Sequence, residues 1–364
     1  MQGEYLITDY GAKGDNAFDN APVINNLIAK FGSSGGSIVI PVGDFRINSP
    51  IVISNKNCVT IRGVNYGQRS NVDPAPPGVF GPAGGSKIIL GAGVQYGIWA
   101  PDSGPQVQGL TIKDVNISAS DGAVYQIGVY VNHSNRWTRI ADVSFVNLKK
   151  GIYLKQADDA NIESCWIAEC ESPLHLDTGN NCIVANNSLG GQTGGITAEF
   201  DAHIGLVFTG NAIFPDGYTC VSLMQATNCN VSYNFFTSPY TGAILIDGSV
   251  NSFIGNNVTA VLVNGNWQTD PKARTASYGL IRISGNDNVM ADTSILSWQP
   301  VNDTRVHCVS GSRNMFRNLY IGANDSFKKL FTEGQTTSTR VTHCGYSNEI
   351  NLGGSATARV EYDP

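Results

Sequence analysis

Acidic side chains gather in one stretch of the sequence, between residues 157 and 201, and two histidines lie in the same stretch. The carboxylates are Asp158, Asp159, Glu163, Glu169, Glu171, Asp177, Glu199 and Asp201, and the histidines are His175 and His203. Cleavage of a glycosidic bond needs two such groups, one that donates a proton and one that acts as a base or nucleophile. Most surface carboxylates are merely solvated, so each position also has a purely structural interpretation.

Two of these residues are selected by the alternation of side chains along a strand. Glu163 points outward if its neighbour Ile162 points inward, and His175 points outward between Leu174 and Leu176. Both would then belong to one coil of a repeat but to different strands of it. Histidine exchanges protons near neutral pH, so Glu163 and His175 form a candidate acid–base pair.

Neighbouring positions and loops supply the other candidates. Asp201 is the third catalytic candidate, although with His203 it flanks an expected turn and can bind the backbone there instead. Trp267 lies in a long loop over 262–278 and is the tryptophan best placed to stack on a sugar. The candidates for substrate binding are Ser164, Trp166, Glu199, His203, Trp267 and Arg69.

A metal site is not indicated. No pair of the eight cysteines has the Cys-x-x-Cys spacing typical of zinc or thioredoxin-like sites, and their even number permits disulfides without requiring them. Motifs for phosphate, dinucleotide or metalloprotease chemistry are missing from the sequence as well. The sequence motifs therefore point to no particular metal or cofactor.

The elements that position these residues follow an internal repeat. An asparagine recurs between short apolar segments at intervals of 24, 23 and 22 residues. The four are Asn187, Asn211, Asn234 and Asn256. Such a period without intervening helices predicts an all-β parallel β-helix, a solenoid whose coils stack to bury their apolar faces. Asparagines stacked at one turn can hydrogen-bond from coil to coil.

The N-terminal part departs from the repeat. Asn20 is expected to cap a helix with Pro22 in its first turn, and Ile24, Leu27 and Ile28 follow helical spacing. This helix would cover the open end of the solenoid. We expect one domain over 1–364, with the cap and first strands in 1–58, coils in 59–330, and C-terminal strands or a tail in 331–364.

Composition limits the partners. Only 14% of the 364 residues are charged and the net charge is −6, which argues against nucleic-acid binding. No apolar run approaches the roughly 18 residues of a membrane span, so no membrane contact is expected. No signal peptide is visible at the start, which leaves localisation undecided, with a secreted mature chain as an alternative.

Several segments together resemble the inulin fructotransferase family. These segments are 166–170, 187–190, 208–215, 21–27, 38–44, 63–67 and 84–88. The resemblance spans about residues 5–300. It implies a right-handed parallel β-helix that forms a homotrimer with active sites between subunits and uses no cofactor. Members release a cyclic difructose dianhydride from inulin by intramolecular transfer, or hydrolyse that dianhydride, and acid–base chemistry is implied at the fructosyl carbon.

The chain departs from this family at the catalytic positions. The resemblance assigns the family's catalytic Asp to Ser164 and its catalytic Glu to His175, and neither residue is a carboxylate here. A shift of one residue would restore Glu163 at the first position only. Three hypotheses follow: a fructan or dianhydride enzyme with a rearranged site, the same scaffold recruited to another reaction such as cyclisation of a non-sugar metabolite, or a saccharide-binding β-helix without catalysis.

Overall fold

The computed structural model describes most of the chain and divides it into two compact units. The described residues are 3–32, 34–54, 56–67, 84–101, 108–119, 125–132, 137–191, 195–214, 219–237, 244–260, 281–297, 306–323, 331–337, 340–342, 350–351 and 359–361. Unit 1 comprises Met1–Gln192 and unit 2 comprises Thr193–Pro364. Arg69 and Trp267 lie outside the described residues. The single domain expected from the repeat stays a prediction.

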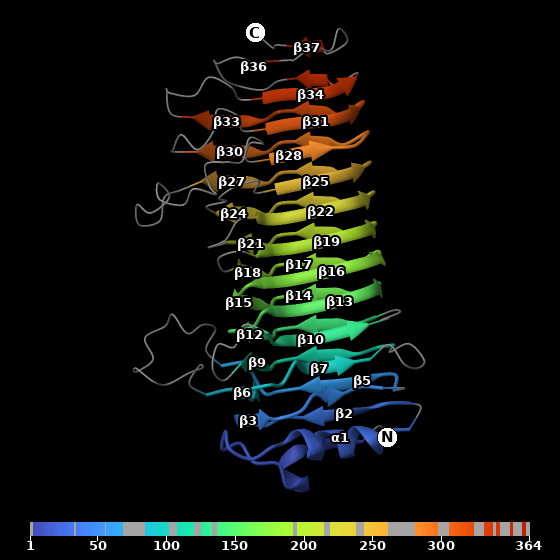
Figure 1. Cartoon of the computed structure of the whole chain (residues 1–364), viewed down its shortest axis with the longest axis vertical. Coiled ribbons are helices and arrows are strands. Elements are labelled where there is room, and N and C mark those ends of the chain that lie inside the picture. The colour runs from blue at the N-terminus through green and yellow to red at the C-terminus, as the bar shows by residue number, and fades with distance from the viewer. Residues whose placement is uncertain are drawn as a thin grey trace. The chain divides into compact units, whose positions relative to one another are not determined.

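Unit 1 is a parallel β-solenoid with three sheets, which we call A, B and C by their order in each coil (Figure 1). Sheet A contains β1 (Glu4–Leu6), β2 (Gly36–Val39), β5 (Val59–Arg62), β8 (Thr111–Lys113), β11 (Arg139–Ala141), β14 (Asn161–Glu163) and β17 (Ile183–Ala185). Sheet B contains β3 (Gly43–Ile47), β6 (Ser86–Leu90), β9 (Asn116–Ala119), β12 (Ser144–Val146), β15 (Trp166–Cys170) and β18 (Ser188–Gly191). Sheet C contains β4 (Ile51–Val52), β7 (Tyr96–Ala100), β10 (Ile127–Asn132), β13 (Lys150–Asp158) and β16 (Ser172–Asn180).

Unit 2 repeats this architecture. Its sheet A contains β20 (Val207–Thr209), β23 (Asn230–Ser232), β26 (Ser252–Ile254), β29 (Val289–Ala291), β32 (Met315–Arg317), β35 (Arg340–Thr342) and β37 (Arg359–Glu361). Its sheet B contains β21 (Ala212–Ile213), β24 (Phe235–Thr237), β27 (Asn257–Ala260), β30 (Ser294–Ser297) and β33 (Tyr320–Ala323). Its sheet C contains β19 (Ile196–Ile204), β22 (Thr219–Thr227), β25 (Ile244–Ser249), β28 (Ile281–Ser284), β31 (Val306–Ser312), β34 (Phe331–Thr337) and β36 (Ile350–Asn351).

Strand pairing confirms the predicted period. In unit 1, Ile140 pairs with Ile162, and Ile162 with Val184, each step 22 residues along the chain. All three side chains are fully buried, so apolar columns run through the core of the solenoid. These columns supply the burial that one coil cannot obtain alone.

The asparagine ladder is also confirmed, and unit 2 shows it most fully. The Oδ1 atom of Asn234 accepts hydrogen bonds from the backbone N and Nδ2 of Asn211, at 2.9 and 3.0 Å. Its Nδ2 donates to the backbone O of Phe208 at 2.9 Å and to Oδ1 of Asn256 at 3.0 Å. A second ladder of the same kind links Asn251 to Asn288. Each asparagine thus holds the preceding coil at its turn.

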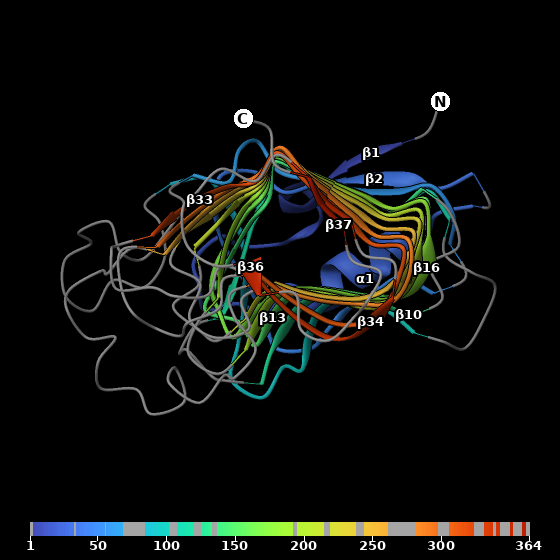
Figure 2. The same ribbon diagram turned by 90° about the horizontal axis from the view of Figure 1, so that it is seen from above.

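The N-terminal helix α1 (Ala21–Ala29) lies at the end of the coil stack of unit 1, as Figures 1 and 2 show. Its buried face includes Ile24, Leu27 and Ile28, as the apolar spacing predicted. Asn20 occupies the N-cap position as predicted, but its side chain makes no capping hydrogen bond, because its buried amide bonds the backbone of Lys13 at 2.8 and 3.0 Å. Asp19 accepts the first free helical N–H, from Ala21, at 3.2 Å.

The described cysteine side chains are free thiols, and all but one are buried. They are Cys58, Cys165, Cys170, Cys182, Cys220 and Cys229. Burial raises the pKa of Cys165 and Cys170 to about 12. These thiols therefore fill the core as small apolar groups. No helix in the described part of the chain is long and apolar enough to cross a membrane.

Replacing a ladder asparagine should destabilise the fold. Asn234→Ala leaves the backbone N of Asn211 and O of Phe208 without this partner, so the free energy of unfolding should fall by at least about 2 kcal/mol. Asn230→Ala removes an exposed asparagine nearby and should change it by less than about 0.5 kcal/mol. Urea denaturation of both variants measures the free energy of unfolding. Equal losses in the two variants would mean that the ladder asparagine contributes no more to stability than an exposed asparagine.

Alkylation should separate the exposed thiol from the core thiols. Iodoacetamide at pH 8 should modify Cys58 in the folded protein and spare Cys165 and Cys170. Their raised pKa keeps them protonated until the pH approaches 12, and the thiolate is the reactive form. Peptide mass spectrometry gives the extent at each site. Modification of Cys165 in the folded state as fast as in urea would contradict this.

Candidate active site

An aromatic column on the outward face of sheet C in unit 1 supports the predicted histidine. It consists of Trp99, Tyr130, Tyr153 and His175, which occupy one register position in β7, β10, β13 and β16. Tyr130 and Tyr153 have ring centroids 5.0 Å apart, and Tyr153 and His175 stack at 4.5 Å with an angle of 10°. Both faces of the Tyr153 ring are therefore covered, so the column is a rigid support rather than a platform for sugar stacking.

His175 alternates with Leu174 and Leu176 as predicted, since both leucines are fully buried in the core. The imidazole is itself only 9% exposed, which differs from the exposed strand residue that the alternation suggested. Lys150, on the preceding coil, makes a close contact with its Nδ1 and also lies 4.8 Å from the centre of the Tyr153 ring. The neighbouring coil thus orients the ring.

The contact with Lys150 selects one tautomer of His175. An ammonium group can only donate hydrogen bonds, so Nδ1 must be the accepting nitrogen. The neutral ring then carries its proton on Nε2. The imidazole ring therefore links the proton on Nε2 to Lys150 at Nδ1.

Asp177 is the carboxylate nearest to His175 along its own strand. The two residues are two positions apart on β16 and share its outward face, about 7 Å apart along the strand. The Tyr153 hydroxyl donates to Asp177 Oδ2 at 3.4 Å, so the aromatic column also positions this carboxylate. Two side chains that project from one face of a strand can reach the same bound bond, as an acid–base pair must.

Glu163 does not share a sheet with His175. It lies on β14 in sheet A, and its Oε1 accepts hydrogen bonds from Nε and Nη2 of Arg139 at 3.0 and 2.5 Å. Ser164 follows at the corner with a φ of 55°, and Trp166 lies half-buried on β15 in sheet B. The outward direction of Glu163 agrees with the prediction. The ion pair with Arg139 gives the Glu163 carboxylate a structural role that is independent of catalysis.

In unit 2 the predicted residues lie on β19. Glu199 and Asp201 are half-buried, and they pair in register with Ser222 and Met224 of the next strand of sheet C. The expected turn between Asp201 and His203 is wrong, because the strand continues through Ala202, which adopts a φ of 49°. His203 is consequently fully buried, edge-on to Phe200 with centroids 6.2 Å apart. It lies in the interior rather than on a substrate-facing surface.

Sequence reasoning missed the supporting residues around His175. Lys150 and Tyr153 precede it by about one repeat, at 25 and 22 residues, and stacked coils bring such positions together. Aligning the repeat through β13 and β16 would have placed Tyr153 beneath His175. Asp177 stood among the acidic residues, and its place two positions beyond His175 is the signal that singles it out.

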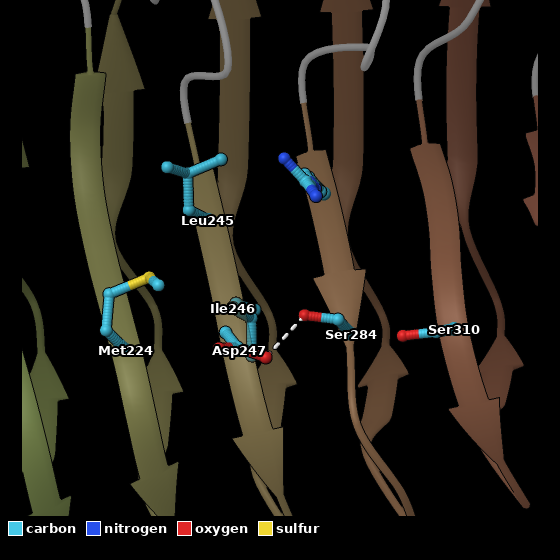
Figure 3. A pocket seen from close by; sticks show the side chains of 7 residues that line it. Met224, Leu245, Ile246, Asp247, Ser284 and Ser310 are labelled. Carbon is cyan, nitrogen blue, oxygen red and sulfur yellow. Dashed lines mark hydrogen bonds between the residues drawn. The ribbon is translucent and has the colours of Figure 1, made fainter.

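A pocket opens on the outward face of sheet C in unit 2 (Figure 3). Its volume is about 270 Å³. It is lined by Met224, Leu245, Ile246, Asp247, Arg282, Ser284 and Ser310. Oδ1 of Asp247 accepts a hydrogen bond from the Ser284 hydroxyl at 2.6 Å. No sequence motif marked these residues.

The chain is thus a parallel β-solenoid. Its candidate sites, at His175 and in the pocket, lie on outward faces of sheet C. The profile of the family described as "Periplasmic copper-binding protein (NosD)" matches residues 86–287, which is more than half of the chain, so the chain belongs to that family. Inulin fructotransferase [DFA-I-forming] of Arthrobacter globiformis is 26% identical over 238 residues. That match covers 62% of this chain and 58% of the relative's length.

Solved structures agree with the fold. DFA-IIIase from Arthrobacter chlorophenolicus A6 without its lid has a TM-score of 0.83 at 20% identity, covering 100% of both chains. The same lidless enzyme in complex with GF2 also gives 0.83, at 21% identity and 100% of both chains. A GH87 α-1,3-glucanase from Streptomyces thermodiastaticus gives 0.52 at 15% identity, covering 98% of this chain and 67% of that one. These similarities bear out the resemblance to the inulin fructotransferase family.

The family description names copper, which favours imidazole, thiolate and thioether ligands. Among the described residues within either single unit, no three His, Cys, Asp or Glu side chains come close enough to share an ion. The buried Cys165 and Cys170 thiols donate to backbone carbonyls and hold their protons, with a pKa of about 12. In the described part of each unit, these two thiols therefore offer copper no thiolate ligand.

Removing the Glu163 carboxylate should have only a small structural effect. Both partners of the Arg139–Glu163 ion pair are partly exposed, so Glu163→Gln should lower the free energy of unfolding by less than about 1 kcal/mol. Its activity should stay close to that of the unmodified protein. If Glu163→Gln lost activity without losing stability, Glu163 would again be a candidate catalytic residue.

Proposed function

We propose that the protein is a carbohydrate-active enzyme that acts on fructosyl linkages of inulin or of a difructose dianhydride, by acid–base chemistry without a cofactor. The observation that carries this proposal is the orientation of His175 by Lys150 and Tyr153, at the position that the family resemblance gives to a catalytic acid. Similarity to inulin fructotransferase and to a DFA-IIIase that binds GF2 supports the substrate class.

In this proposal His175 is the proton donor. Its Nε2 proton passes to the departing glycosidic oxygen as the bond from that oxygen to the fructosyl carbon breaks. Nδ1 takes a proton from Lys150 at the same time, which leaves a neutral amine. The imidazole remains neutral throughout, so no second positive charge forms beside the lysine. Lys150 acts through His175 and is therefore a positioning and proton-supplying residue.

Asp177 is the base in this proposal. It takes the proton of the attacking hydroxyl, internal to the sugar for transfer or from water for hydrolysis, as the new bond to the fructosyl carbon forms. The proton then returns to Lys150 through solvent, which restores both groups. The Tyr153 hydroxyl, 3.4 Å from Asp177, holds the carboxylate in place. Roles for Glu199, Asp201 and Ser164 stay predictions.

A product assay tests the function. The purified protein is incubated with inulin and, separately, with difructose dianhydride, and the sugars are separated by chromatography. A dianhydride released from inulin supports transfer, and difructose released from dianhydride supports hydrolysis. Folded protein that yields no product from either substrate would overturn the fructan assignment and favour recruitment to another reaction or binding without catalysis. Light scattering on the same sample checks the expected homotrimer.

Substitutions at the proton donor should separate proton transfer from structure. His175→Ala should lower kcat by about 10²–10⁴, the contribution of a positioned proton donor or acceptor. Lys150→Arg keeps the positive charge but cannot release a proton, so it should lower kcat with little change in KM. Lys113→Met, on β8 in sheet A, is the matched control and should retain full activity. Unchanged kcat in Lys150→Arg would exclude the proton supply from lysine.

A further inference from the structure

We infer that the pocket on sheet C of unit 2 is a second, non-catalytic binding site for a neutral sugar ring. It is lined by side chains of four successive strands, β22, β25, β28 and β31 (Figure 3). Its residues are distinct from the His175 site, and nothing in the catalytic proposal uses them. The choice of a sugar as ligand rests on the proposed function, whereas the site itself rests on its own geometry.

The charged groups of the pocket favour a neutral ligand. Arg282 contributes a group that only donates hydrogen bonds, and Asp247 contributes one that only accepts them. An anion is attracted by Arg282 but repelled by Asp247, and a cation is attracted by Asp247 but repelled by Arg282, so neither gains from the pair as a whole. A polyhydroxylated ligand can satisfy both, because each hydroxyl both donates and accepts.

The hydroxyl groups extend this polar edge. The Ser284 hydroxyl donates to Oδ1 of Asp247 at 2.6 Å, which fixes the orientation of the carboxylate, and Figure 3 shows Ser310 beside it on the next strand. In-register pairing of Ser284 with Ser310 and with Asp247 keeps the three groups in one row. Preorganised polar groups of this kind lower the cost of binding a ligand.

Apolar groups line the rest of the pocket. Met224 is 39% exposed and Leu245 is half-buried, while Ile246 belongs to the core beneath them. A sugar ring has hydroxyl groups on its edge and C–H groups on its faces, so it can cover Met224 and Leu245 while its edge bonds Asp247 and Arg282. A volume of about 270 Å³ lies just below the usual range of ligand sites, about 300–1,000 Å³, and suits a single ring.

Calorimetric titration tests this site without turnover. The starting protein carries His175→Ala, and the probes are fructose, sucrose and a short fructo-oligosaccharide. Adding Arg282→Ala or Asp247→Asn should raise the Kd for a bound probe at least about tenfold, because each removes a charge-assisted hydrogen bond. The matched control is Arg317→Ala, an exposed arginine on sheet A of the same unit, which should bind as the starting protein does.

The outcomes separate this inference from the catalytic proposal. A Kd that does not change in either pocket variant, or a protein that binds none of the probes, overturns the sugar site even if the wild-type chain releases product. Loss of affinity in the pocket variants supports the site even if the wild-type chain releases none. Fructose 6-phosphate should bind no more tightly than fructose, because Asp247 repels the phosphate that Arg282 attracts, and tighter binding of the phosphate would overturn the assignment to a neutral ligand.

Discussion

The whole fold depends on the fact that a single coil cannot complete its own backbone hydrogen bonds or bury its own apolar face. A coil of short strands leaves its backbone N–H and C=O groups and its apolar face for the neighbouring coil to complete. At the corners between strands, residues such as Ser164 and Tyr233 adopt left-handed backbone angles. These angles cost conformational energy for residues other than glycine. The asparagine ladders offset this cost, because each amide bonds the preceding turn through both its oxygen and its nitrogen.

The same in-register stacking determines how a site can be built. Side chains one repeat apart in sequence become neighbours in space, so a functional group is supported from the coil below rather than from its own strand. Tyr153 and Lys150 support His175 in this way in unit 1. Asp247, Ser284 and Ser310 form a row by the same rule in unit 2. Rigid columns of this kind preorganise polar groups.

The repeat was predictable from the sequence because it follows from the spacing of buried residues. Ile140, Ile162 and Val184 lie in register as that spacing requires. The candidate site was predictable only in part. Alternation along a strand gave the direction of His175, but it does not include Lys150 and Tyr153, which contact its ring from the preceding coil.

The errors have local physical causes. Asn20 occupies the N-cap position, yet backbone groups of Lys13 and Arg46 hold its side-chain amide, so the neighbouring Asp19 accepts the Ala21 N–H instead. Asp201 and His203 have the composition of a turn, but one left-handed residue at Ala202 lets the strand continue, which turns His203 into the core. Around Ala202, the pairing of β19 with β22 overruled the local turn propensity.

The histidine at position 175, where the family resemblance implies a carboxylate, has a physical explanation in the same stacking. A carboxylic acid must keep its proton in order to donate it, and a lysine ammonium beside it would favour the charged form instead. With Lys150 directly below, an imidazole suits this position better, because it can pass a proton from one nitrogen to the other while staying neutral. The identity of the residue at 175 is therefore coupled to that at 150, one repeat earlier. A carboxylate at 175 would be expected to work only if Lys150 were also replaced.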